Sequence, residues 1–236
     1  MHDVAVLHHV VLAFDAELAC FANGSFGTVL DVVIVLDDLG ADEAFLEVGV
    51  DDTGTLRSFP ALVVGPGFHF HFAGGDERFQ IEQPLIYAVI EQESCFNPQA
   101  TSHIPAYGLM QLVPTSGGID AYRFVYGVEK VPTKSYLFDP DQNIELGTAY
   151  LRILYNWFES VKDVHCRRLC VIAGYNTGAG NVSRAFIGTT QLSNAYNEIN
   201  KFDYKRLYQH LTRHLSTDEA RNYVKGVTKK REKYIK

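Results

Sequence analysis

Glu93 occupies a position at which a carboxyl group could serve as a general acid. Residues 84–92 have the apolar spacing of a helix, and on this helix the carboxylate shares a face with Ile86, Val89 and Ile90. Burial on that face disfavours the charged carboxylate and raises its pKa. A carboxyl group that stays protonated near neutral pH can donate a proton to a leaving group. The structural alternative is a partly exposed carboxylate paired with a Lys or Arg.

The predicted helix has a start and an end in the sequence. Pro84 suits its first position, where the missing N–H is not needed, and Asn97-Pro98 biases the chain out of helical geometry. Further blocks of polar and glycine residues follow. In order, they are Ser94 with Asn97-Pro98 and Ser102; Gly108-Leu109-Met110-Gln111; Ser135 to Pro140, Asn143-Ile144 and Gly147 to Leu151; Ala173-Gly174-Tyr175-Asn176 with Gly178 and Gly180; and Leu211 to Val224.

These blocks, taken together and in this order, resemble the lysozyme-like lytic transglycosylases, and most closely their membrane-bound type C subfamily. The resemblance covers about residues 79–236, with one small departure at Gly174, where the family usually has Ala. It implies a mostly α-helical, lysozyme-like catalytic domain over residues 79–236. Residues 1–78 are then a separate acidic segment of undefined structure, with α+β or β character.

The resemblance also implies roles for five side chains. Glu93 matches the only catalytic carboxylate of the family. Ser102 and Gln111 match residues that line the sugar cleft. Tyr175 and Asn176 match a pair that lies across from the acid and contacts either the acid or the reacting sugar.

Several of the matched residues also have a purely structural interpretation. Gly108-Leu109-Met110 is predicted to form a tight turn and core packing. Gly178 and Gly180 are predicted to be turn residues with positive φ. Ser102 fits a turn or a helix cap as well as it fits a sugar-binding role.

The activity implied by the resemblance is cleavage of the β-1,4 bond between N-acetylmuramic acid and N-acetylglucosamine in peptidoglycan. Glu93 would protonate the linking oxygen, the substrate's N-acetyl group would assist, and Glu93 would then deprotonate the muramic C6 hydroxyl to give a 1,6-anhydromuramoyl end. Glycoside hydrolases ordinarily need two carboxylates, whereas this reaction uses no water and needs one. No block supplies an obvious second acid, because Asp139 and Asp141 are predicted to cap a helix.

Two other functions remain open. A goose-type lysozyme on the same fold would hydrolyse the bond and release reducing ends. A glycan-binding module without activity is the alternative outside enzymes, and the presence of Glu93, Gln111, Tyr175 and Asn176 argues against it.

Charge is distributed unevenly along the 236 residues, which carry a formal net charge of −7. Residues 1–80 hold 13 Asp/Glu against 2 Lys/Arg, whereas residues 81–236 hold 15 against 19. A mildly basic catalytic region suits an anionic polymer such as peptidoglycan glycan strands. The excess of basic residues is too small, and too little interleaved with aromatic residues, to indicate binding of nucleic acid.

The first 78 residues do not resemble the family. Residues 29–36 and 68–72 have strand patterning, and Gly74-Gly75 indicates a loop or linker. The segment is either an accessory domain or the product of a wrong start or reading frame, and both explanations stay open. In either case we predict that residues 1–78 are dispensable for folding and chemistry.

The sequence gives few signals for location, metals or assembly. Residues 1–20 lack the basic start of a secretory signal, and Glu17 interrupts a lipoprotein-like box ending at Cys20. The absence of an 18-residue apolar run predicts no transmembrane helix. The resemblance implies a monomer in the cell envelope, in the periplasm or at the inner face of the outer membrane.

Histidine and cysteine pairs lack the spacing of a zinc site, so no metal or other cofactor is predicted. The pair Cys166 and Cys170 is expected on a buried helix face, His210 and His214 on a solvated helix, and His69 and His71 on a sheet face.

Overall fold

The computed structural model describes residues 46–50, 56–60 and 78–235. The chain divides into two units, residues 1–69 and residues 70–236. The boundary predicted between residues 78 and 79 stays a prediction.

In the first unit, β1 (Leu46–Val50) and β2 (Leu56–Pro60) form an antiparallel pair. Val48 faces Ser58 across this pair. Neither strand was predicted from the sequence. The strands that it did predict, at residues 29–36 and 68–72, lie outside the described residues, as do His69 and His71.

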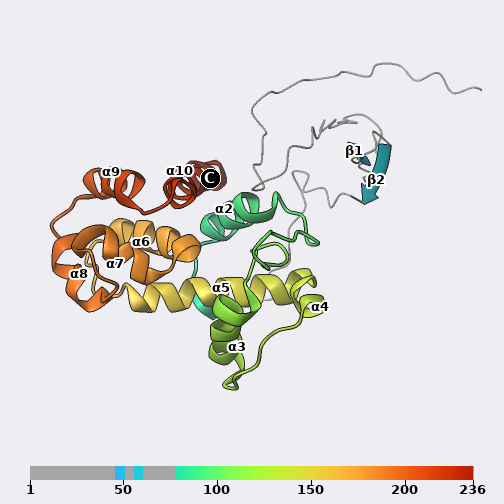
Figure 1. Cartoon of the computed structure of the whole chain (residues 1–236), viewed down its shortest axis with the longest axis horizontal. Coiled ribbons are helices and arrows are strands. Elements are labelled where there is room, and N and C mark those ends of the chain that lie inside the picture. The colour runs from blue at the N-terminus through green and yellow to red at the C-terminus, as the bar shows by residue number, and fades with distance from the viewer. Residues whose placement is uncertain (1–45, 51–55, 61–77, 236) are drawn as a thin grey trace, which may run out of the picture. The chain divides into compact units, whose positions relative to one another are not determined.

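Between residues 78 and 235, all the regular helices and strands that the structure describes are helices (Figure 1). This confirms the predicted mostly α-helical fold. Arg78 and Phe79 also have helical backbone. The helices are α2 (Gln83–Ser94), a π-helical turn η1 (Pro114–Gly118), α3 (Ile119–Tyr126), α4 (Lys134–Leu137), α5 (Pro140–Trp157), α6 (Val164–Thr177), α7 (Ala179–Ile187), α8 (Leu192–Ile199), α9 (Tyr204–His214) and α10 (Asp218–Tyr234).

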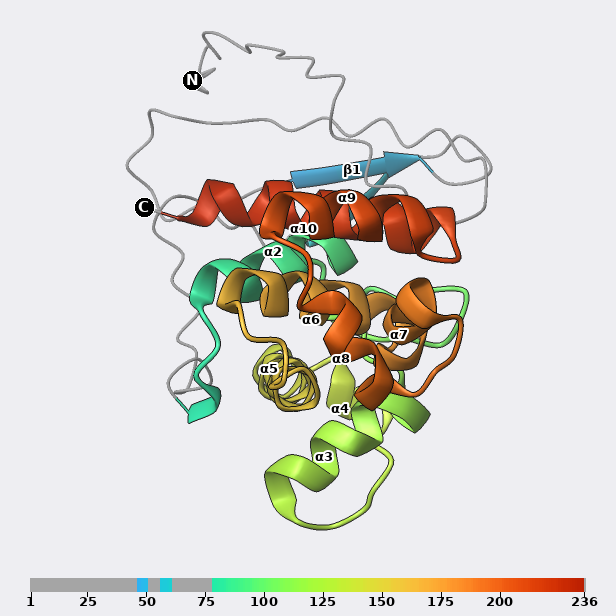
Figure 2. The ribbon, with the colours of Figure 1, turned by 90° about the vertical axis from the view of Figure 1, so that its left-hand side faces the viewer.

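Helix α2 lies in the core and packs along α10 (Figure 2). It begins at Gln83, one residue before the predicted start, because Glu82 already has the extended backbone of an N-cap residue. It ends where Cys95 and Phe96 adopt left-handed backbone. Its apolar residues are almost completely inaccessible to solvent: Leu85, Ile86, Ala88, Val89 and Ile90. Glu93 therefore lies in the last turn of a buried helix.

Helix α5 crosses the unit lengthwise and is seen end-on in Figure 2. The Asp139 carboxylate accepts a hydrogen bond from Gln142 N (3.0 Å), and Asp141 lies in the first turn. Both acids thus act at the helix N-terminus as predicted, where negative charge is favourable.

Helix α6 buries Cys166 and Cys170, which confirms the predicted buried helix face. Both are free cysteines. Helix α9 is mostly exposed, as predicted, and on it His214 is exposed whereas His210 is not fully exposed. The His210 ring is half-buried because it stacks on Phe186 at 4.4 Å between ring centroids. Its Nε2 atom lies 2.9 Å from Ala185 O.

The described part of the chain contains no group of three or more His, Cys, Asp or Glu side chains placed to hold a metal ion. None of the helices in that part has the length and apolar character needed to cross a membrane.

Candidate active site

A buried asparagine on α5 holds the loop that follows Glu93. Asn143 Oδ1 accepts a hydrogen bond from Met110 N (2.8 Å), and its Nδ2 donates to Tyr107 O (2.9 Å) and Leu137 O (2.7 Å). Gly108 has φ +78°, and a Cβ there would lie 2.1 Å from Leu137 O. The loop therefore requires glycine at this position, both for its backbone conformation and for the space.

The same loop is attached to the end of α2. Ser94 Oγ donates to Ile90 O in its own helix (3.1 Å) and to Leu109 O in the loop (2.8 Å). Leu109 and Met110 have no exposed surface, which confirms the predicted turn and core packing. The residue next to Glu93 thus fixes the helix end against the loop.

Glu93 remains partly exposed, yet protein atoms enclose its carboxyl group. Burial raises its pKa to about 8, and the negative charge of Glu219 acts in the same direction. The Tyr223 hydroxyl donates a hydrogen bond to Glu93 Oε1 (2.7 Å), which lowers the pKa but does not cancel the effect of burial. Glu93 is therefore protonated at neutral pH, as a general acid must be.

Two residues of this site come from α10 and were missed by the sequence analysis. Tyr223 is 4% exposed, and its own pKa is raised well above the ordinary value by burial and by the charge of Glu93, so it stays a hydrogen-bond donor. Glu219 is a second carboxylate near Glu93, and its negative charge raises the pKa of Glu93. The available signal was their spacing of four residues, which places them on one helical face.

The Tyr175-Asn176 pair lies at the C-terminal end of α6. The Tyr175 hydroxyl donates to Met110 O (2.8 Å), and its pKa is raised by burial and by the charge of Glu93. Asn176 Nδ2 donates to Glu219 Oε1 (3.1 Å). The structure therefore brings both predicted residues to the site, where the tyrosine contacts the loop and the asparagine contacts the second carboxylate.

The polar side chains of Ser102 and Gln111 organise the loop itself. Ser102 Oγ accepts from Ala106 N (3.3 Å) and donates to Ile104 O, so it fulfils the alternative prediction of a turn residue. Gln111 Nε2 donates to two loop carbonyls, Ala100 O (3.0 Å) and Gly108 O (2.8 Å). Gln111 directly follows Met110, the residue that accepts the Tyr175 bond. The side-chain contacts of Ser102 lie within its own turn.

One of the two predicted glycine turns is present. Gly178 has φ +82° at the junction of α6 and α7, as predicted. The prediction is wrong for Gly180, which lies inside α7 without positive φ. A Cβ at Gly180 would come within 3.2 Å of Thr190 Cβ, so close packing is the reason for a small residue there.

Taken together, the described residues place a protonated carboxyl group beside a buried tyrosine hydroxyl and a second carboxylate. This arrangement can protonate a leaving-group oxygen near neutral pH and take the proton back afterwards. The combination of burial and a specific charge partner is typical of catalytic acids.

Comparison with known proteins also identifies similarity to lytic transglycosylases. The family described as "Transglycosylase SLT domain" matches residues 71–204. Relatives named membrane-bound lytic murein transglycosylase C include one from Pectobacterium atrosepticum, 41% identical over 159 residues, and one from Haemophilus ducreyi, 39% identical over 160 residues. These alignments cover 67% of this chain and 44% and 43% of the relatives, so the chain spans less than half the length of either.

A solved structure also has this fold. An inactive mutant of lytic transglycosylase Slt from Pseudomonas aeruginosa matches 72% of this chain and 24% of its own, with a TM-score of 0.51 and 27% identity. Since the family match covers more than half of the 236 residues, the chain belongs to the transglycosylase SLT domain family.

Proposed function

We propose that this protein cleaves the β-1,4 bond between N-acetylmuramic acid and N-acetylglucosamine in peptidoglycan by lytic transglycosylation. The observation that carries the proposal is Glu93, a carboxyl group with a pKa of about 8 that accepts a hydrogen bond from Tyr223. The names of the relatives, which describe lytic murein transglycosylases, support it.

In the first step Glu93 gives its proton to the glycosidic oxygen. The bond from C1 of the muramic residue to that oxygen breaks, the electron pair leaves with the N-acetylglucosamine oxygen, and the N-acetyl carbonyl oxygen of the substrate bonds to C1. Glu93 becomes a carboxylate at this point. The Tyr223 hydroxyl bond stabilises that charge, as a fixed dipole does where charge develops.

In the second step the Glu93 carboxylate removes the proton from the muramic C6 hydroxyl. The C6 oxygen then attacks C1, displaces the N-acetyl oxygen and closes a 1,6-anhydro ring. The proton taken from the C6 hydroxyl restores the protonated form of Glu93, and the cycle consumes no water. A high pKa serves both steps, because it makes the carboxyl group an available acid and its carboxylate an adequate base at neutral pH.

Four further side chains are proposed to bind the glycan: Ser102, Gln111, Tyr175 and Asn176. The contacts of Tyr175 and Asn176 support this role, because they connect these two residues to the loop and to Glu219 at the site of the acid. Gln111 belongs to the same loop. For Ser102 the support is the resemblance alone.

Hydrolysis of the same bond is the second candidate function, because Glu219 supplies the second carboxylate that a hydrolase ordinarily uses. Water would then replace the C6 hydroxyl as the acceptor, and the product would carry a reducing end. The chemical form of the muramic end released from purified sacculi distinguishes the two functions.

We expect opposite pH shifts from two variants on α10. Activity needs protonated Glu93 and is lost as the pH rises through its pKa. Tyr223→Phe removes a bond that lowers this pKa, so the alkaline limb of the pH–rate profile should move to higher pH. Glu219→Gln removes a charge that raises it, so the limb should move to lower pH. Turnover of sacculi between pH 5 and 10 measures both, and shifts of the same sign would contradict the assigned electrostatics.

The remaining proposals concern the protein's setting. We propose that the protein is a monomer. We also place it in the cell envelope, in the periplasm or at the inner face of the outer membrane, because the relatives are named as membrane-bound. Residues 79–236 are proposed as the catalytic domain, and residues 1–78 as a separate segment.

A further inference from the structure

Helices α2 and α10 lie side by side and run antiparallel (Figure 2). Tyr223, early in α10, meets Glu93 at the end of α2. Three residues later, Gly226 approaches α2 so closely that a Cβ would lie 2.2 Å from Gln92 Oε1. The register of one helix along the other therefore determines where the Tyr223 hydroxyl lies relative to the acid.

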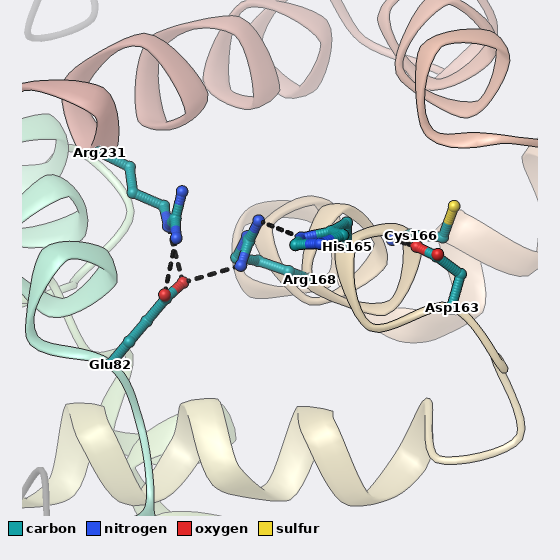
Figure 3. Close-up of polar contacts among 6 residues, drawn as sticks. All are labelled: Glu82, Asp163, His165, Cys166, Arg168 and Arg231. Atoms are coloured by element: carbon teal, nitrogen blue, oxygen red, sulfur yellow. Dashed lines mark hydrogen bonds and ion pairs between the residues drawn. The ribbon is translucent and has the colours of Figure 1, made fainter. Parts of the chain in front are cut away.

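Away from Glu93, a cluster of ion pairs joins the start of α2 to the last turns of α10 (Figure 3). Glu82, the N-cap residue of α2, accepts from Arg231 Nε and Nη2 on α10, both at 2.7 Å. It also accepts from Arg168 Nη1 on α6 at 3.2 Å. His165 Nδ1 lies 2.9 Å from the Arg168 guanidinium. Figure 3 shows the Glu82 carboxylate between the two guanidinium groups.

This cluster is better suited to fix geometry than an ordinary surface ion pair. The side chains of Arg168 and Arg231 are only 14% and 16% exposed. Two parallel bonds from one guanidinium to one carboxylate restrict both distance and orientation. Burial would raise the pKa of Glu82, but the Arg231 hydrogen bonds and the charges of both arginines hold it below the ordinary value, so the carboxylate stays charged.

The ion-pair cluster acts on Glu93 through the positions of α2 and α10, and not through direct electrostatic interaction with its carboxyl group. Arg231 follows Tyr223 by eight residues, about 12 Å along α10, and Glu82 precedes Glu93 by eleven residues, about 16 Å along α2. Besides burial, the groups that shift the pKa of Glu93 are Tyr223 and Glu219, and Glu82 is not among them. A register shift of α10 by one residue combines a rise of about 1.5 Å with a rotation of about 100°, and this rotation would turn the Tyr223 hydroxyl away from Glu93.

We propose that Glu82 is a positioning residue for the general acid: through Arg231 it fixes the register of α10 along α2 and thereby holds the Tyr223 hydroxyl on Glu93. This inference rests on the proposed role of Glu93 as the acid. Three groups face Glu93 from the surrounding elements, namely Tyr223 and Glu219 on α10 and Tyr175 on α6.

The direction in which the Glu93 pKa changes on replacement of Glu82 distinguishes a positioning role from a through-space effect of the Glu82 charge. Burial is the largest cause of the raised pKa of Glu93, and it is retained when α10 slides along α2 without leaving it. Such a slide displaces both Tyr223 and Glu219, and of these two the Tyr223 hydrogen bond has the larger influence on the pKa. Loss of register therefore raises that pKa. Removal of the Glu82 charge, acting only through space, would lower it, because a nearby negative charge favours the protonated acid.

The test is a cycle of four full-length proteins: wild type, Glu82→Gln, Tyr223→Phe and the double variant. The Glu93 pKa is measured in each by NMR titration of the ¹³C-labelled carboxyl group. We expect both single variants to raise the pKa, and the double variant to match Tyr223→Phe alone. An unchanged or lowered pKa in Glu82→Gln, or a double-variant shift equal to the sum of the single shifts, would overturn the proposal.

Two further variants complete the design. Glu145→Gln is a matched control, because Glu145 is similarly half-buried and bonds Arg78 (2.5 Å) and the Tyr126 hydroxyl (2.6 Å) away from α10; it should leave the Glu93 pKa unchanged. Arg231→Lys keeps the charge but loses the paired bonds, and it should raise the pKa even if Glu82→Gln does not fold. An unchanged pKa there also overturns the proposal. The titration needs no substrate, whereas failure of the proposed function would appear as intact sacculi.

Discussion

Replacing Glu93 by Gln is expected to lower the turnover of purified sacculi by about 10²–10⁴-fold or more, the usual loss when a general acid is removed. The amide has the same shape and can still accept the Tyr223 hydrogen bond, but it has no proton of suitable acidity to give. Binding to sacculi, measured by co-sedimentation, should remain near the wild-type level. Release of soluble fragments, measured by chromatography, should be lost.

Asp139→Asn and Asp141→Asn are the controls for that experiment. Both carboxylates lie at the N-terminus of α5, where they cap the helix or favour its dipole. Turnover should therefore stay close to wild type in each. Near wild-type activity in Glu93→Gln would show that Glu93 is not the general acid.

The same substitution is expected to stabilise the fold at alkaline pH. In the folded chain the pKa of Glu93 is about 8, against an ordinary value of 4.5. Between these two values the folded state binds more protons at this site than the unfolded state, so the stability of the wild type falls as the pH rises from about 4.5 to 8. At about 1.4 kcal/mol per pKa unit, with allowance for partial exposure, the loss is on the order of 3 kcal/mol.

Thermal unfolding at several pH values checks this expectation. Glu93→Gln carries no titrating group at the site, so it should melt about 5–10 °C above wild type at pH 8, and the difference should shrink toward pH 5. Glu145→Gln serves as a control for a lost carboxylate elsewhere and should show no such gain. Equal melting temperatures of Glu93→Gln and wild type at pH 8 would mean that the carboxyl group is solvated and its pKa ordinary.

Much of the site was predictable because its signals are local in sequence. The position of Glu93 follows from the helical spacing of its neighbours, and the cap at Asp139 follows from the residues around it. Tyr223 and Glu219 could not be assigned, because the contact with Glu93 joins residues 130 positions apart. A spacing of four residues identifies a shared helix face but does not say which helix lies opposite.

The errors have equally physical reasons. Gly180 was expected at positive φ, but a glycine can also be required by a close neighbour, here Thr190, that lies ten residues away. His210 was expected on a solvated helix, and the sequence did not indicate that its ring stacks on Phe186 of another helix. In β1, the apolar residues Leu46, Val48 and Val50 alternate with Glu47 and Gly49, a period-two signal that the sequence analysis did not use.

Mass spectrometry of fragments released from purified sacculi in H₂¹⁸O tests transglycosylation most directly. If the C6 hydroxyl is the acceptor, the muramic ends contain no ¹⁸O and weigh one water less than the corresponding reducing ends. We predict this result for the wild-type chain, with no fragments released by Glu93→Gln. If most muramic ends are reducing and carry one ¹⁸O atom, water is the acceptor, and the enzyme is a hydrolase.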